Sequence, residues 1–170
     1  MKTVLSIAGT DPTGGAGIQA DIKTIEAHGL YGMASITVVI AQNTMGVSDL
    51  QPVPPELVAK QIDCVFDDIR PDAVKLGMLY DAEIIHAVAD RLRVHHAKNV
   101  VLDPVMLSSS GHALSKPGAM QALQEEIFPL CTLVTPNLHE AAAICGYSIG
   151  TRAEMEQAAR DIAAKTGGAV

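Results

Sequence analysis

The most informative stretch of the sequence is residues 7–21, which read IAGTDPTGGAGIQAD. It joins the end of an apolar run of strand length to a glycine-rich turn, and the turn to a stretch with helical periodicity. The glycines let backbone N–H groups approach a ligand closely, and Asp21 lies one turn inside the helix. The stretch therefore predicts a strand, a turn and a helix that together hold a small polar ligand.

Apolar runs of strand length alternate with helical stretches along the rest of the chain. We expect strands at residues 4–8, 35–41, 73–76, 100–103 and 132–135. We expect helices at residues 16–28, 56–69, 82–95, 117–128, 138–145 and 153–165. In the first helix Ile18, Ile22 and Ile25 form one apolar stripe. In the fourth, Ser115 suits the cap and Pro117 the first turn. The alternation predicts an α/β fold with a parallel sheet and right-handed crossovers, in one domain over residues 1–170.

The stretch from Gln42 to Pro55 interrupts this alternation. It crowds glycine, proline, asparagine and aspartate residues into one connection between a strand and a helix. A connection of this length inside a compact domain is usually functional or mobile. We therefore expect an irregular functional segment here.

Composition excludes several classes of partner. Aromatic residues make up 3% of the chain while aliphatic residues dominate, which suits buried parallel strands. The net charge is −7 and no basic cluster is present, which argues against a nucleic-acid surface. The apolar run at the N-terminus is too short for a signal-peptide core or a membrane span. We therefore expect neither nucleic acid nor a membrane as partner.

The cysteines and histidines indicate no metal site or disulfide framework. Cys64, Cys131 and Cys145 are odd in number and widely spaced, and we expect all three to be small buried hydrophobes. No zinc spacing occurs among the histidines, and the pair His95-His96 is expected to be an exposed helix end. This cysteine usage is typical of a reducing compartment, so we expect a cytoplasmic protein.

The glycine-rich turn resembles two phosphate-binding motifs without matching either. Gly9 and Gly14 have the Walker A spacing, but Gly15 and Ala16 stand where that loop needs Lys and Ser or Thr. The run from Gly15 also fits the dinucleotide pattern, yet the next strand ends without an acid that would hold a ribose. The turn alone would favour a phosphate at the helix N-terminus.

Four further motifs follow in order along the chain: Gln42-Asn43-Thr44-Met45-Gly46-Val47, Lys75-Leu76-Gly77-Met78-Leu79, Asp103-Pro104-Val105-Met106 and Thr135-Pro136-Asn137-Leu138-His139-Glu140. With residues 7–21, this set resembles the hydroxymethylpyrimidine and phosphomethylpyrimidine kinases of thiamine synthesis, within the ribokinase-like superfamily. The resemblance implies a three-layer α/β/α fold with a mostly parallel central sheet. It also implies an enzyme that uses ATP and Mg²⁺, in which residues 42–55 form a flap over the substrate, and a homodimer.

The resemblance implies a pocket for an aminopyrimidine, built from Gly9, Ala16, Asp21, Gln42, Met78 and Val105. An amide such as Gln42 can pair with the ring nitrogen and the amino group together. Each residue also has a simpler interpretation: Gln42 as a turn residue, Asp21 as a solvated helix acid, and the apolar three as core.

The resemblance also places Asp103, Asn137 and Glu140 beside the ATP phosphates. Asp103 and Glu140 would arrange Mg²⁺, through water, since this ion favours oxygen ligands and retains water. Without the resemblance, Asn137 and Glu140 would be interpreted as a helix cap with a first-turn acid.

The last residues, Thr166-Gly167-Gly168-Ala169-Val170, read as a helix exit and the start of a new strand. We therefore expect this chain to be the N-terminal part of a kinase whose C-terminal part is missing here. The lysine-glycine-glycine turn and the glycine-threonine-glycine-cysteine helix start of the family would lie beyond Val170, so no catalytic residue is assigned and the chain alone is expected to be inactive. Two alternatives remain: a pyridoxal kinase of the same superfamily, and a non-catalytic pyrimidine-binding module.

Overall fold

The computed structural model describes residues 1–105 and 115–170, so Met106 of the fourth motif lies outside the described residues. Its strands are β1 (Thr3–Ala8), β2 (Tyr31–Ile36), β3 (Val38–Asn43), β4 (Gly46–Pro52), β5 (Ala73–Leu76), β6 (Val100–Leu102) and β7 (Leu133–Val134). Its α-helices are α1 (Gly17–Ala27), α2 (Pro55–Asp68), α3 (Ala82–Val94), α4 (Ala119–Ala122), α5 (Leu138–Cys145) and α6 (Arg152–Thr166). Two short helical segments, η1 (Leu123–Ile127) and η2 (Phe128–Leu130), continue α4.

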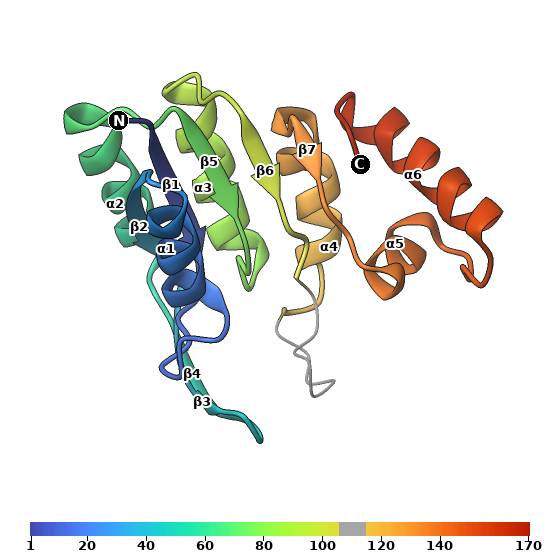
Figure 1. Ribbon diagram of the computed structural model, residues 1–170, viewed down its shortest axis with the longest axis horizontal. Coiled ribbons are helices and arrows are strands. Elements are labelled where there is room, and N and C mark those ends of the chain that lie inside the picture. Colours follow the sequence, from blue (N-terminus) through green and yellow to red (C-terminus); the bar gives the residue numbers. More distant parts are fainter. Residues whose placement is uncertain (106–114) are drawn as a thin grey trace.

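Five parallel strands form the central sheet in the order β2-β1-β5-β6-β7. Figure 1 shows them side by side. Ala169 pairs with Leu133 of β7 in an isolated parallel bridge, so the residues after α6 return to the sheet. The predicted parallel sheet is thus confirmed.

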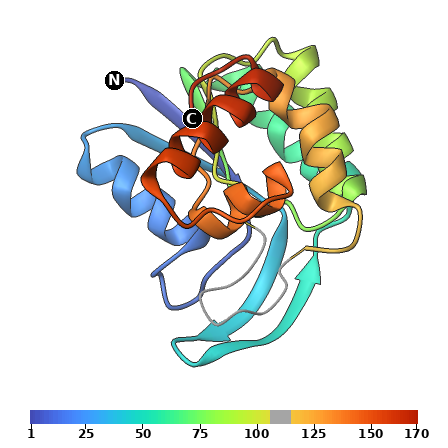
Figure 2. The same cartoon turned by 90° about the vertical axis from the view of Figure 1, so that its right-hand side faces the viewer.

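Helices cover both faces of the sheet. The first crossover runs from β1 through α1 to β2, whereas the later ones run the opposite way across the sheet, which moves their helices to the other face. Figure 2 shows α1 on one side of the strands and α3 and α4 on the other. The core lies between these layers, and its largest fully buried side chains include Leu5, Ile7, Ile62, Leu76, Ile84, Ile127 and Phe128.

The apolar stripe of α1 packs as its spacing predicts. Ile18 is buried, and Ile22 and Ile25 lie directly over Gly32 of β2. A Cβ atom on Gly32 would stand 2.9 Å from the Cδ1 of Ile22, so a larger residue there would push the end of that side chain aside.

The strand predicted at residues 35–41 is wrong in its extent. The chain instead breaks at Thr37, whose N–H bonds the Ala8 carbonyl and whose hydroxyl bonds the Met78 carbonyl at 2.7 Å. Beyond this break, β3 and β4 form an antiparallel hairpin separate from the main sheet. The hairpin projects from the end of the sheet at which β1 and β5 finish (Figure 1). The irregular segment expected at residues 42–55 therefore contains a strand. Its residues are exposed or half-buried and include turn-forming types, so the sequence pattern does not indicate a strand there.

The helix predicted at residues 117–128 begins later than expected. Gly118 has a φ of 87°, a left-handed conformation that cannot continue a helix, and α4 starts at Ala119. The Ser115 hydroxyl donates to the Val105 carbonyl at 3.5 Å and does not cap the helix.

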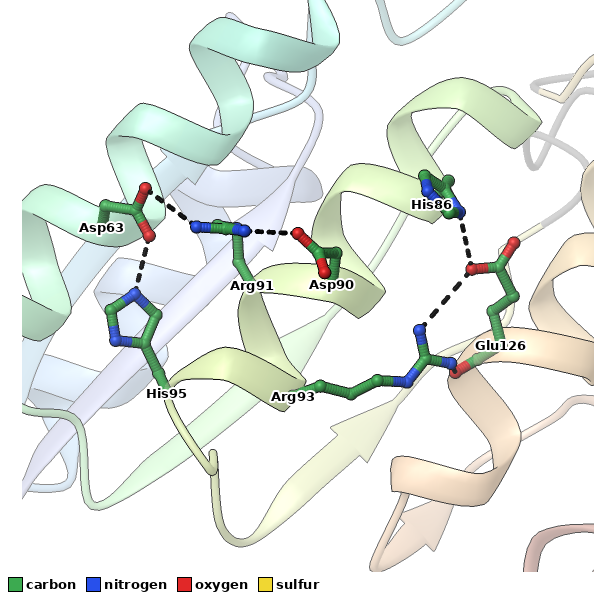
Figure 3. A network of polar contacts seen from close by, with 7 residues as sticks. All are labelled: Asp63, His86, Asp90, Arg91, Arg93, His95 and Glu126. Carbon is green, nitrogen blue, oxygen red and sulfur yellow. Dashed lines mark hydrogen bonds and ion pairs between the residues drawn. The ribbon is translucent and has the colours of Figure 1, made fainter.

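Charged contacts link the helices on the face opposite α1 (Figure 3). Arg91 of α3 contacts Asp63 of α2 and Asp90, and Glu126 of η1 contacts both His86 and Arg93 of α3.

Two surface predictions need correction. His95 is not an exposed helix end, because its ring stacks on Phe66 at 4.6 Å and contacts Asp63 at 2.7 Å. Cys64 is exposed, whereas Cys131 is buried and burial raises the pKa of its thiol to about 12. The expectation of three buried cysteines is therefore confirmed only for Cys131, because Cys64 is exposed and Cys145 is half-buried.

Among the described residues, no helix combines the length and the apolar character needed to cross a bilayer.

Candidate functional site

A cavity of about 220 Å³ lies at the carboxyl ends of β1 and β5. The crossovers that follow these neighbouring strands lead to opposite faces of the sheet, and such switch points are where open α/β sheets bind ligands. A cavity below the roughly 300–1,000 Å³ of drug-sized sites suits one small ring. Its lining includes every residue predicted for the pyrimidine pocket, namely Gly9, Ala16, Asp21, Gln42, Met78 and Val105, together with Asp103.

The glycine turn lines one end of the cavity, and a backbone hydrogen bond joins it to the first turn of α1. The N–H of Ile18 donates to the Gly9 carbonyl at 3.0 Å. Gly17 has a φ of 56°, and a Cβ atom there would stand 2.5 Å from the same carbonyl oxygen. Only glycine fits this position without moving the turn.

Asp11 organises the turn from within. Its carboxylate accepts hydrogen bonds from the Thr13 N–H and hydroxyl and from the N–H groups of Gly15 and Ala16, at 2.8–3.0 Å. Burial alone would raise the pKa of Asp11, but the hydrogen bonds from the Gln42 side chain, Thr13 and Ala16 outweigh it and lower this pKa to about 2. The carboxylate is therefore ionised at neutral pH and only accepts hydrogen bonds.

The hairpin forms the next wall and carries Gln42. Thr10 ties the turn to β3, since its N–H donates to the Val38 carbonyl and its hydroxyl accepts from the Ile40 N–H, both at 2.9 Å. The pairing of β3 with β4 shifts register between Ala41 and Gln42. Such a bulge changes the direction in which a side chain points, and the Gln42 that follows it lines the cavity.

A charged group forms another part of the lining. The Lys75 ammonium lies 3.0 Å from Asp21, and the hydroxyl of fully buried Ser6 donates to the same carboxylate oxygen at 2.6 Å. Burial raises the pKa of Asp103. The positive charge of the nearby Lys75 lowers this pKa, and the negative charge of Asp21 raises it further. Lys75 therefore balances two carboxylates at the end of a buried sheet.

Apolar side chains complete the walls. Met78 and Ile40 are buried, and a Cβ atom on Gly9 would stand 3.2 Å from a terminal carbon of each. Val105 packs against this cluster. An apolar slot with a few polar groups at its edge can hold a flat, partly polar ring.

Asn137 and Glu140 do not line this cavity. They form a capping box at the start of α5, in which the Asn137 N–H donates to Glu140 at 2.9 Å and the Glu140 N–H donates to Asn137 at 3.0 Å. Asn137 instead borders a separate apolar cavity of about 590 Å³ between α5 and α6. The helix-cap interpretation of these residues describes the structure, and their role near ATP stays a prediction.

Sequence reasoning did not assign Asp11 or Lys75 to the site. Lys75 carried a signal, because a lysine within the apolar run Ala73-Val74-Lys75-Leu76 of a central strand requires a nearby anion. Asp11 carried a weaker one, since an aspartate before a proline in a glycine-rich turn is common.

The family model described as phosphomethylpyrimidine kinase matches residues 11–170. The chain is 54% identical to the hydroxymethylpyrimidine/phosphomethylpyrimidine kinase of Salmonella typhimurium over 140 residues, covering 82% of this chain and 53% of that protein. It is 48% identical to the Escherichia coli protein of the same name over 173 residues, covering 100% and 65%. The chain thus spans between about half and two thirds of the length of these two relatives.

Solved structures agree with this match. The phosphomethylpyrimidine kinase of Clostridium difficile has a TM-score of 0.91 at 43% identity, covering 97% of this chain and 71% of that one. The Staphylococcus aureus pyridoxal kinase in complex with AMP-PCP and pyridoxal has a TM-score of 0.85 at 36% identity, covering 99% and 60%. The fold is therefore ribokinase-like, as expected from the motifs.

Proposed function

We propose, from the premise that this chain belongs to the phosphomethylpyrimidine kinase family, that its cavity binds the acceptor of an ATP-dependent phosphoryl transfer. The acceptor is 4-amino-5-hydroxymethyl-2-methylpyrimidine or its monophosphate, in thiamine synthesis. The observation that carries the proposal is the convergence of Gly9, Ala16, Asp21, Gln42, Met78 and Val105 on one small cavity at the switch point of the sheet. We further propose a cytoplasmic enzyme.

The pocket supplies alignment, which is most of what phosphoryl transfer asks of a protein. The apolar walls hold the ring, Gln42 pairs with its nitrogen edge, and Asp21 faces the cavity beside Lys75. We assign no general base to these 170 residues.

Asp103 is suited to help hold Mg²⁺. Burial raises the pKa of this carboxyl and Lys75 only partly opposes that rise, so a nearby cation would stabilise its charged form. Mg²⁺ keeps several waters and needs only one or two carboxylates beside the phosphates, where it would neutralise their charge. No cage of three His, Cys, Asp or Glu side chains occurs in the described part of the chain, and Glu140 is engaged in its capping box. Asp103 is therefore the better-placed of the two predicted ligands.

Pyridoxal is the second candidate acceptor. The structural match to a pyridoxal kinase favours it, because the whole described fold is shared. Gln42 favours the aminopyrimidine, whose adjacent ring nitrogen and amino group suit a single amide.

Gln42→Ala is expected to weaken aminopyrimidine binding by about 10- to 100-fold, equivalent to roughly 1–3 kcal/mol, because buried polar groups of the ligand lose their partner. Calorimetric titration measures this affinity, and thermal unfolding checks that the hairpin remains folded. A matched control is Gln51→Ala on β4, an exposed residue outside the cavity. Unchanged affinity in Gln42→Ala with native stability would return Gln42 to the role of a turn residue.

The chain of 170 residues alone is expected to give no turnover with Mg-ATP. The glycine-threonine-glycine-cysteine motif that the family resemblance assigns to the phosphates does not occur in the sequence. A coupled ADP-release assay, with the E. coli relative as positive control, checks this. Turnover comparable to that control would show that the 170 residues hold a complete active site.

We also propose that the protein is a homodimer, as the resemblance implies. The exposed Val39 and Met45 on the hairpin are apolar side chains that a second copy could cover. Sedimentation velocity would reveal a monomer if this part of the proposal is wrong.

A further inference from the structure

We propose that Ser6 is a positioning residue, which orients Asp21 so that one carboxylate oxygen meets the hydroxyl group of the alcohol acceptor. The inference rests on the proposed function, because it concerns how the same cavity aligns its ligand. Asp21 is among the described residues that line the cavity, whereas Ser6 is not. Ser6 therefore acts on a ligand through Asp21 rather than by touching it.

Asp21 lies on the side of α1 that packs against the sheet. It follows Ile18 and precedes Ile25 at helical spacing, so the three side chains share one face of the helix. The Asp21 side chain is 18% exposed. Because water reaches it poorly, a carboxylate in this position needs hydrogen-bond donors from the strands beneath the helix.

The sheet supplies two such donors from neighbouring strands. Ser6 of β1 and Lys75 of β5 are register partners, so their side chains project from the same face of the sheet. The Ser6 hydroxyl donates to Oδ2 of Asp21 at 2.6 Å, and the Lys75 ammonium donates to the same oxygen at 3.0 Å. Both contacts fall on Oδ2, and within residues 1–105 and 115–170 none is made to Oδ1. The protein thus holds one oxygen and leaves the other for a ligand.

Of the two donors, Ser6 is the one that fixes the orientation of the carboxylate. Ser6 is fully buried, and its hydroxyl moves only by rotation about a single side-chain bond. Lys75 has a long flexible stem, and its positive charge also acts on Asp103. The ammonium can shift between the two carboxylates, whereas the hydroxyl stays where β1 places it. Removing this hydroxyl should therefore free the carboxylate of Asp21 to rotate.

The oxygen that remains for a ligand selects the group that it binds. A carboxylate oxygen only accepts hydrogen bonds, so Oδ1 requires a donor from the ligand. 4-Amino-5-hydroxymethyl-2-methylpyrimidine has two donor groups, the amino group and the hydroxyl. Gln42 pairs with the amino group and the ring nitrogen, which leaves the hydroxyl for Asp21. This hydroxyl receives the phosphoryl group, so its alignment by Oδ1 serves the transfer.

Calorimetric titration of the chain with two probes tests the inference. The probes are 4-amino-5-hydroxymethyl-2-methylpyrimidine and 4-amino-2,5-dimethylpyrimidine, which lacks the hydroxyl. The chain is expected to bind the hydroxyl compound about 10- to 100-fold more tightly, as for a hydrogen bond to a charged group. In Ser6→Ala this ratio of affinities should fall by about 3- to 10-fold. Ser6→Cys keeps the shape of the side chain but offers only a weak donor, so the ratio should fall there too.

Ser35→Ala is the matched control. Ser35 is also a fully buried serine, on β2 beside β1, but its hydroxyl has no hydrogen-bond partner in the described part of the chain. The two alanine variants make the same truncation, and Ser35→Ala should keep the parent ratio. Thermal unfolding of both variants distinguishes a loss of packing from a loss of ligand alignment.

A double variant shows whether Ser6 acts through Asp21. In an Asp21→Ala background, Ser6→Ala should no longer change the ratio, because the carboxylate that Ser6 orients is absent. An unchanged ratio in both Ser6→Ala and Ser6→Cys would overturn the inference while leaving the proposed function intact, as would an equal fall in Ser35→Ala. A parent chain that binds neither probe would overturn both.

Discussion

Gly17→Ala is expected to abolish aminopyrimidine binding and to lower the stability of the chain by about 2 kcal/mol or more. The left-handed backbone alone costs a residue with a Cβ atom about 1–2 kcal/mol. In addition, the new Cβ would stand 2.5 Å from the Gly9 carbonyl oxygen, so the turn must move away from α1. Because Gly9 and Ala16 both line the cavity, this movement deforms it. Thermal unfolding and calorimetric titration measure the two effects.

Gly29→Ala provides the matched control. Gly29 has a φ of 70°, but nothing lies within 4 Å of the position of its Cβ atom. The control therefore has the backbone strain without the collision, and should keep full ligand affinity. Equal losses of stability and normal binding in both variants would show that the contact between Gly17 and Gly9 does not shape the site.

Lys75→Met is expected to destabilise the chain by about 2–4 kcal/mol at neutral pH. The Lys75 ammonium lies 3.0 Å from Asp21, and the two side chains are only 26% and 18% exposed, so the lost pair is not well replaced by water. Asp103 also loses the positive charge that restrains its pKa. The variant leaves two carboxylates near each other in a half-buried cavity.

The pH dependence of Lys75→Met provides an independent check. A carboxyl whose folded pKa lies above its unfolded value loses stability as pH rises through that window, so the variant should recover part of its stability as pH falls from neutrality towards 3.8, the ordinary pKa of an aspartate. The double variant Lys75→Met/Asp21→Asn removes one of the two charges and should restore stability at neutral pH. Denaturant unfolding that shows no loss in Lys75→Met, or no recovery in the double variant, would contradict the role given to Lys75.

Strands and helices with strong periodicity were predicted well from the sequence. The predicted strand at residues 73–76 and helix at residues 138–145 agree with the structure at both ends, because apolar runs and caps mark their limits. The failures lie where a tertiary contact overrides local pattern. The break at Thr37 depends on hydrogen bonds to Ala8 and Met78, which are distant in sequence, and the start of α4 depends on a left-handed glycine.

The candidate site was only partly predictable for a similar reason. Residues of the Gln42, Met78 and Val105 motifs could be assigned from their order along the chain, and the structure brings them together. Lys75 acts through Asp21, a partner that only the fold supplies, and the Asp11 carboxylate through N–H groups that converge on it only once the turn has folded. Asn137 and Glu140 show the opposite problem, because a helix cap and a cation site use the same residue types at the same spacing.

A calorimetric titration of the 170-residue chain decides whether this cavity is an aminopyrimidine site. The chain is titrated separately with 4-amino-5-hydroxymethyl-2-methylpyrimidine and with pyridoxal. We expect one-to-one binding of the aminopyrimidine, at least about 10-fold tighter than that of pyridoxal and reduced in Gln42→Ala. Tighter binding of pyridoxal, or binding of the aminopyrimidine that is unchanged in both Gln42→Ala and Gly17→Ala, would contradict it.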